Sequence, residues 1–328
     1  MKVGVVGGGI AGALLALRLR REHGAEVEVF TLGPSTPDAS GVSGGLVRGY
    51  ERDPGASRLA ALGLAELRDS PELLEWTGYR ETGSVYLLPP DAGPPELTAV
   101  RELLPGSAEV VDSAEAARRY GFAGGDGATA VVERHAGFLS PAGLRVRALD
   151  WLARHGATVR ETRVERAGAD TVVAGGTERR YDAVVVAAGA WTGALAPGQW
   201  RTKQIQFGVY RVELPGLAVF VDDVTGLFGR PWAPGRFLLG LGCDRWDVDP
   251  DRVEVDTGHA EDVTAAVLRR FGVRPEPVRA VASCDGYGPP GGLRLRVEGG
   301  VRTFAGGSGG SVKTVLAASR VAARELAA

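Results

Sequence analysis

The sequence predicts an α/β fold in which a Rossmann-like nucleotide-binding domain is joined to a second, α+β domain built on an antiparallel sheet. At the N-terminus, residues 3–6 read as a buried strand, residues 11–22 as a helix and residues 26–31 as a second strand, together the length of a βαβ unit. A glycine-rich motif lies between the first strand and the helix. Further along, alternating segments over residues 201–283 indicate the antiparallel sheet.

The glycine-rich motif predicts a bound dinucleotide. Gly7, Gly9 and Gly12 form a G-x-G-x-x-G pattern that follows a strand and opens a helix. The first glycine permits a tight turn, the second lets a pyrophosphate approach the backbone, and the third lets helix and strand pack closely. The free N–H groups at the helix start would then face the phosphates. A glycine-rich turn without a ligand is the alternative.

The end of the second strand departs from the usual dinucleotide pattern. An Asp or Glu normally stands there and binds the ribose hydroxyls, but this chain has Thr31. Glu28 lies three residues earlier, so its side chain is expected on the other face of the strand. No Arg occurs between Arg21 and Arg48, so nothing here favours the 2′-phosphate of NADP either.

The nucleotide-binding domain is predicted to be discontinuous. We assign residues 1–80, 140–200 and 284–328 to it, and residues 81–139 and 201–283 to the substrate-binding domain. The apolar run AVVVAA is typical of a parallel strand that is buried on both faces. Outside the first unit, we expect a loop over 33–47, helices over 57–69, 141–156 and 259–271, and a strand, glycine-rich turn and helix over 300–328.

Composition limits the classes of partner and location. The 328 residues carry a net charge of −2, which gives no reason to expect nucleic acid or an anionic membrane as a partner. No signal peptide or membrane span is visible, so a cytoplasmic enzyme is expected. The two cysteines make no disulfide framework. No metal site is expected, since the histidines are scattered: His23, His135, His155 and His259.

Lysine is rare in this chain. Arg greatly outnumbers Lys, and the only lysines are Lys2, Lys203 and Lys313. Two explanations of this scarcity are equally good: a coding bias toward Arg, or a need for a compact ammonium group at the two internal positions.

Four stretches of the chain carry a family resemblance. The run AVVVAAGAW at 183–191, joined to the glycine motif, distinguishes FAD proteins from simple NAD dehydrogenases. Together with residues 5–19, 39–48, 157–195 and 284–314, it resembles the D-amino acid oxidase superfamily, in particular its sarcosine oxidase and glycine oxidase branch. The resemblance implies an FAD-binding domain of the GR2 type and FAD as the cofactor.

The resemblance also implies which residues hold FAD. The helix that starts near Ser311 would aim its N-terminus at the flavin pyrimidine ring, where reduced flavin is negative and a helix dipole is stabilising. For Trp191, a place in the core is as good an interpretation as contact with the flavin. The residues implied are Ser40 and Ser43 beside the pyrophosphate, Val164 at adenine, Ala188, Gly189 and Trp191 along the flavin, and Gly307, Gly309 and Lys313 at the glycine-rich turn.

Arg48 and Lys313 are the predicted substrate anchors. In the sarcosine oxidase branch, an Arg after the serine loop and a Lys in the C-terminal glycine turn hold the substrate carboxylate, and this chain matches both places. Arg supplies bidentate geometry and Lys a point charge. The alternative is a surface Arg and a Lys that merely begins a helix, although a Lys there opposes the helix dipole.

Cys284 is a candidate for covalent attachment. It falls where relatives of monomeric sarcosine oxidase bond a cysteine to the flavin 8α carbon, and Pro290 keeps the family spacing. A buried cysteine that acts as a small hydrophobe is the alternative. Cys243 has no evident partner and is assigned to packing.

Several positions depart from the sarcosine oxidase branch. Its oxygen-activating Lys aligns with Gly240, a following His with Asp244, and an aromatic substrate position lies near Phe228. Slow reaction of the reduced flavin with oxygen is therefore expected, unless another cation replaces the missing one. Lys203 could be that cation, or a solvated residue at a strand end.

The function predicted from these residues is an FAD-dependent oxidation of the C–N bond of a small amino or imino acid, N-alkyl or cyclic. A hydride would pass to flavin N5 and leave an imine. The implied partners are a carboxylate-bearing amine and oxygen or another electron acceptor. Two alternatives stay open: a flavin dehydrogenase or biosynthetic tailoring enzyme that uses another acceptor, and a non-catalytic binding protein on a flavin fold.

Overall fold

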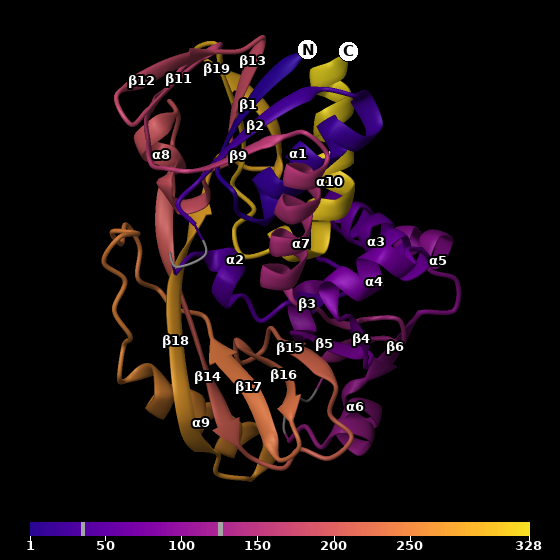
Figure 1. The fold of residues 1–328 in the computed structure, drawn as a ribbon. Coiled ribbons are helices and arrows are strands. Elements are labelled where there is room, and N and C mark those ends of the chain that lie inside the picture. The colour runs from indigo at the N-terminus through magenta and orange to yellow at the C-terminus, as the bar shows by residue number, and fades with distance from the viewer. Residues whose placement is uncertain (34–36, 124–126) are drawn as a thin grey trace.

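The computed structural model describes residues 1–33, 37–123 and 127–328, and the first of its two units is organised around a six-stranded sheet whose strands come from the start, middle and end of the chain. The strand order is β19-β20-β13-β1-β2-β9, and every neighbouring pair except β19–β20 is parallel. Figure 1 places both chain termini at the end of the molecule that holds this sheet. Its strands are β1 (Lys2–Val6), β2 (Glu26–Thr31), β9 (Thr158–Glu161), β13 (Ala183–Val186), β19 (Arg294–Glu298) and β20 (Val301–Ala305).

Helix α1 (Ile10–His23) is the central helix of this unit because most of its side chains are small or apolar and buried. It packs against α7 (Pro141–Arg154) and α10 (Ser311–Ala327), and α10 packs in turn on α3 (Pro54–Asp69). Helix α1 ends at Gly24, whose φ of 64° is the left-handed conformation that glycine adopts most easily. Shorter helices nearby are α2 (Ala39–Val42), α4 (Pro71–Thr77), α5 (Thr98–Leu103) and α8 (Thr192–Leu195).

An eight-stranded sheet forms the second unit, in the order β18-β14-β17-β16-β15-β5-β7-β6. Helix α9 (His259–Phe271) packs on four of its strands, and α6 (Ser113–Tyr120) lies at the β6 edge. Inside this unit, Arg270 of α9 pairs with the fully buried Asp222 of β15 at 2.8 Å. The strands are β5 (Ser84–Leu88), β6 (Ala108–Asp112), β7 (Thr129–Glu133), β14 (Arg201–Arg211), β15 (Val219–Asp222), β16 (Leu227–Ala233), β17 (Arg236–Leu241) and β18 (Glu276–Tyr287).

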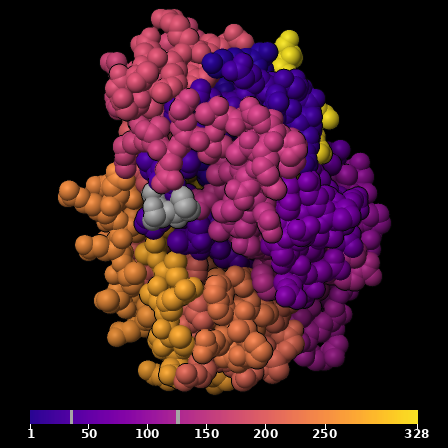
Figure 2. Space-filling view, viewed as in Figure 1, coloured from indigo at the N-terminus to yellow at the C-terminus, as the bar shows by residue number. Residues whose placement is uncertain are grey.

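The two longest strands connect the units. Strands β14 and β18 pair along their whole lengths and run from the first unit into the second, as Figure 1 shows. Figure 2 shows the orange and yellow segments of the second unit meeting the indigo and magenta segments across one face of the molecule. Two small sheets complete the fold: β10 (Val164–Ala167), β11 (Thr171–Ala174) and β12 (Thr177–Arg180), and β3 (Leu46–Val47), β4 (Arg80–Glu81) and β8 (Gly137–Phe138).

The predicted fold class and most predicted elements are confirmed. The helix expected over 57–69 begins earlier, at Pro54, because the Asp53 side chain accepts a hydrogen bond from the Ala56 N–H and caps it. The stretch expected as loop over 33–47 contains α2 and β3, while its residues 34–36 lie outside the described part. The proposed domain boundaries stay a prediction.

Candidate functional site

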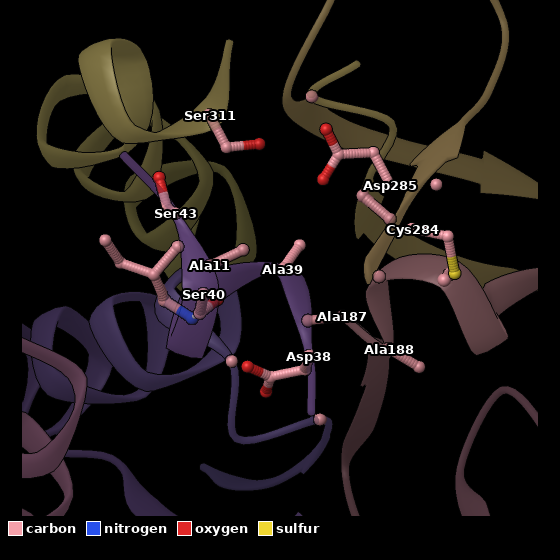
Figure 3. A pocket seen from close by; sticks show the side chains of 18 of the residues that line it. Ala11, Asp38, Ala39, Ser40, Ser43, Ala187, Ala188, Cys284, Asp285 and Ser311 are labelled. Carbon is pink, nitrogen blue, oxygen red and sulfur yellow. The ribbon is translucent and has the colours of Figure 1, made fainter. Parts of the chain in front are cut away.

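A cavity of about 500 Å³ lies where the strands of the first sheet end and the second sheet begins. Its walls come from the turn after β1, the end of β2, the segment after β13, the middle of β14 and the start of α10. The carboxyl ends of parallel strands are the usual ligand-binding edge of such sheets. The volume is within the range of small-molecule sites. Figure 3 shows side chains from several of these segments facing one another.

The glycine motif has the geometry that a bound pyrophosphate requires. Gly7 has a φ of 120°, and a Cβ there would overlap the carbonyl group of Ala187. A Cβ on Gly12 would overlap the carbonyl oxygen of Gly7, so this glycine sets the close packing of α1 on the turn. Gly9 differs, because a Cβ there would meet only the Ser40 hydroxyl, at 3.3 Å, on the cavity wall.

The N-terminus of α1 opens on the same cavity. Gly9 is its N-cap and offers no capping side chain, while the Ile10 N–H donates to Ser40 Oγ at 3.0 Å. The remaining N–H groups of the first turn face the space where phosphates would lie. Ser43, also on the wall, accepts a hydrogen bond from the Gly45 N–H at 3.1 Å.

Strand β2 presents Thr31, and not Glu28, to the cavity. Thr31 Oγ1 accepts a hydrogen bond from the Gly33 N–H at 3.2 Å, which leaves its own O–H free to donate to a ribose hydroxyl. Glu28 lies on the other face, where the Tyr181 hydroxyl donates to it at 2.8 Å and Arg160 pairs with it. As the sequence predicts, the residue at the ribose position is therefore Thr31 and not an Asp or Glu.

The remaining cofactor positions expected from the resemblance also line the cavity. Trp191 is not a core aromatic, because it is half-buried and its Nε1–H donates to Asp251 at 3.0 Å. A Cβ on Gly307 would overlap the Ser311 hydroxyl, so the turn into α10 needs glycine there. The cavity-lining members of this set are Val164, Ala188, Gly189, Trp191, Gly307 and Gly309.

Arg48 and Lys313 meet at one end of the cavity through a carboxylate that the sequence analysis missed. Glu51 Oε1 lies 2.9 Å from Arg48 Nη2 and 2.7 Å from Lys313 Nζ. Arg48 is 5% exposed, and its guanidinium also lies over the Tyr86 ring at 4.7 Å and donates through Nε to the Tyr50 carbonyl. Both cations line the cavity, so neither is a surface residue.

The three groups of this ion cluster, Arg48, Glu51 and Lys313, influence one another's pKa values. Burial, followed by the neighbouring Arg48, lowers the pKa of Lys313 to about 8, although Glu51 acts to raise it. Burial disfavours the charged form of Glu51, but Arg48 and Lys313 outweigh it and hold its pKa below the usual range. At neutral pH the three groups together carry one positive charge in excess.

Asp285 is a second carboxylate that the sequence analysis missed. It follows Cys284 on β18 and lines the cavity, and its carboxylate makes no hydrogen bond or ion pair with the residues that the structure describes. In Figure 3 its carboxylate and the Ser311 hydroxyl point toward one another. Burial raises the pKa of Asp285 to about 6. Among the described residues of the wall, Asp38 is the only other acid, and it caps α2 and pairs with Arg145.

Comparison with known proteins identifies the family of this chain. A sequence profile of the FAD-dependent oxidoreductase family, DAO, matches residues 2–325. The chain belongs to this family. A search of curated protein sequences finds no match.

Solved structures share the whole fold at low sequence identity. L-proline dehydrogenase from P. horikoshii is 16% identical with a TM-score of 0.84, covering 99% of this chain and 92% of its own. Glycine oxidase from Geobacillus kaustophilus is 19% identical with a TM-score of 0.79, covering 99% and 94%. NikD, an unusual amino acid oxidase essential for nikkomycin biosynthesis, is 21% identical with a TM-score of 0.77, covering 99% and 93%.

The residues present fit FAD, the cofactor of the family. The glycine turn, the open helix N-terminus and the threonine hydroxyl suit the dinucleotide half, and α10 directs its positive end toward the cavity, where a reduced flavin is negative. No described helix has the length and apolar character to span a bilayer. Within residues 1–33, 37–123 and 127–328, no cluster of His, Cys, Asp and Glu could hold a metal ion.

Cys284 lines the FAD cavity but is not poised as a thiolate. It is 3% exposed, and burial, followed by the nearby Asp285, raises its pKa to about 12. Figure 3 shows its sulfur pointing away from both Asp285 and Ser311. Covalent attachment to FAD therefore stays a prediction, which the intact mass of the purified holoprotein decides. Cys243 is half-buried and does not line this cavity.

Lys203 does not line the cavity that fits FAD. Its Nζ lies 4.7 Å from the Trp246 ring centroid and 4.0 Å from Asp244, and the side chain is absent from the described cavity wall. The alternative interpretation, a partly solvated strand residue, is the one that the structure favours. Asp244 is also outside the cavity, with a 93% exposed side chain.

Gly240 leaves no room for a lysine. A Cβ there would lie 2.5 Å from the Phe228 ring and 3.0 Å from the Phe207 Cβ. Phe228 itself lines the FAD cavity. Aromatic packing thus occupies the space at Gly240, where the family resemblance implied a cation.

The glycine motif yields a matched pair of variants. Gly9→Val should fold but not retain FAD, because its added atoms occupy the pyrophosphate space and meet only Ser40 within the protein. Gly12→Val should instead lower the Tm of the apoprotein, because its side chain overlaps Gly7. The flavin-to-protein absorbance ratio and a thermal melt measure both effects. Full FAD retention by Gly9→Val would contradict this assignment.

Proposed function

We propose that this FAD-dependent oxidoreductase oxidises the C–N bond of a small amino or imino acid. One observation carries the proposal: a single cavity holds two buried cations that share one carboxylate, and, separately, a carboxylate with no described partner. An excess positive charge and a lone negative charge complement the carboxylate and the amine of a zwitterion. The names of the structural neighbours, a proline dehydrogenase and a glycine oxidase, agree with this substrate class.

The substrate carboxylate would bind at Arg48 and Lys313. Because Glu51 neutralises only one of the two cations, their cluster attracts one further anion. Arg48 is fixed by the Tyr50 carbonyl and the Tyr86 ring, so its guanidinium is preorganised. Anchoring the carboxylate here places the adjacent carbon inside the cavity that holds FAD.

Asp285 would bind the amine and accept its proton. A carboxylate whose pKa is near 6 is charged at neutral pH and can take a proton from the substrate ammonium. FAD bound in this cavity would supply the hydride acceptor. Loss of a hydride from the α-carbon of the neutral amine would give an iminium ion, which would release its N–H proton to leave an imine for water to hydrolyse.

The pH dependence of flavin reduction tests this function. Reduction should fail as pH drops through about 6, because Asp285 is then neutral, and carboxylate binding should weaken as pH rises through about 8, because Lys313 loses its charge. Stopped-flow reduction without oxygen, with a panel of amino and imino acids, measures both limbs. Asp285→Asn should remove the acid limb and Lys313→Met the alkaline one. If no amino or imino acid reduces the flavin of the holoprotein, the proposed function is wrong.

A second candidate function, a dehydrogenase that uses an acceptor other than oxygen, is favoured by the packing at Gly240. Phe228 fills the space in which relatives carry a cation, and Lys203 points elsewhere. Loss of one preorganised electrostatic group typically costs about 10²–10³ in rate.

Turnover with two acceptors separates oxidase from dehydrogenase. We expect reoxidation by oxygen to be about 10²–10³ slower than in the sarcosine oxidase branch, and turnover with a dye acceptor to exceed turnover with oxygen. Steady-state rates under air and under argon with the dye provide the measurement. Fast oxygen turnover that persists in Lys203→Met would show that another group supplies the charge.

A further inference from the structure

A second cavity adjoins the FAD cavity. It has a volume of about 860 Å³ and shares two wall residues, Ser43 and Phe207, with the first. Its other walls come from the start of α7, the end of α4, and strands β8, β16 and β18. A group bound here lies next to the loop that borders the FAD site.

The wall of this second cavity is strongly basic. Arg80, Arg230 and Arg279 line it, and no Asp or Glu does so among the described residues. None of the three makes an ion pair with a described acid. The first turn of α7, at Ser140 and Pro141, adds the positive end of a 14-residue helix.

Arg230 is the unusual member of this group because it is 7% exposed. The described chain has five arginines in the buried class, and the other four each pair with a carboxylate. Those four are Arg18, Arg48, Arg145 and Arg270. A buried guanidinium without a carboxylate is costly, so an anion that completes it would be stabilising.

The contacts of Arg230 leave one edge of its guanidinium unused. Nε donates to the Gly44 carbonyl at 2.6 Å and Nη1 to the Pro231 carbonyl at 2.9 Å. The rings of Phe138 and Trp232 lie 4.3 and 4.8 Å from its central carbon. Nη2 makes no hydrogen bond to any described residue, although carbonyls and rings fix the group in place. Burial alone lowers the pKa of Arg230 to about 10, so it stays charged at neutral pH.

We infer that this second cavity binds an acidic group at the far end of the substrate, so that the substrate is an amino or imino acid with a second carboxylate. The inference rests on the proposed function, in which the first carboxylate binds at Arg48 and Lys313. Ser43 and Phe207 lie on the walls of both cavities, so the two ends of such a substrate would bind on either side of these residues. Arg279, with its guanidinium 5.5 Å from the Trp232 ring, is an exposed cation on the wall of the second cavity.

Calorimetry on the oxidised holoprotein tests the inference without turnover. The probes are acetate, the straight-chain dicarboxylates from succinate to suberate, and inorganic phosphate. At least one diacid should bind tenfold or more tightly than acetate, because it reaches both cation groups. Arg230→Met should remove that advantage and leave the affinity for acetate unchanged. Arg279→Met, an exposed position that should not disturb folding, should reduce the advantage in part.

Arg236→Met provides the matched control. Arg236 is an exposed arginine at the start of the neighbouring strand β17, outside both cavities, so its loss should change neither affinity. Diacids that bind no more tightly than acetate would overturn the inference, as would an advantage that survives in both Arg230→Met and Arg279→Met. Phosphate binding at Arg230 without any diacid advantage would also overturn it, since the cavity would then hold a free anion.

Failure of the inference can be told from failure of the proposed function. If Arg48→Met leaves acetate affinity unchanged, the first carboxylate does not bind where we propose. If Arg48→Met weakens acetate but Arg230→Met leaves the diacids unaffected, only the second site is wrong.

Discussion

Glu51 holds Arg48 and Lys313 together by one shared oxygen, and the proposed substrate end of the FAD cavity depends on this contact. Arg48 and Glu51 follow β3 near the N-terminus, whereas Lys313 lies in the first turn of α10, so the cluster joins segments from opposite ends of the chain. Removal of one member would leave a buried charge without its partner, at a cost of about 3–5 kcal/mol. The cluster therefore fixes both the position of α10 and the charge that a substrate meets.

The two cavities differ in how their cations are balanced. In the FAD cavity, Glu51 partly neutralises Arg48 and Lys313, and Asp285 adds a negative charge nearby. In the second cavity no described acid balances Arg230. A ligand that spans both would meet positive charge at its two ends and negative charge at its amine. This pattern selects against simple cations and favours a zwitterion with an additional acid.

Sequence reasoning succeeded where the determinants are local. Gly7, Gly9 and Gly12 act within one turn, so their spacing alone predicts their geometry, and the FAD cofactor follows from the family match. The approach of Arg48 and Lys313 was predicted from the family pattern. Lys203 was a weaker inference, because the direction of a side chain near a strand end depends on neighbours such as Trp246.

Glu51 and Asp285, which the sequence analysis missed, acquire their roles only through tertiary placement. Nothing local distinguishes Glu51 from other acids; only the docking of α10 makes it the bridge between Arg48 and Lys313.

The affinity of the holoprotein for acetate should rise tenfold or more in Glu51→Gln, about 1.4 kcal/mol, because both cations are then free for the ligand. Calorimetry at pH 6 keeps Lys313 charged, and Glu72→Gln, which removes an exposed partner of Arg21, is the control. Unchanged or weaker acetate binding in Glu51→Gln would contradict the proposal that Arg48 and Lys313 bind the substrate carboxylate.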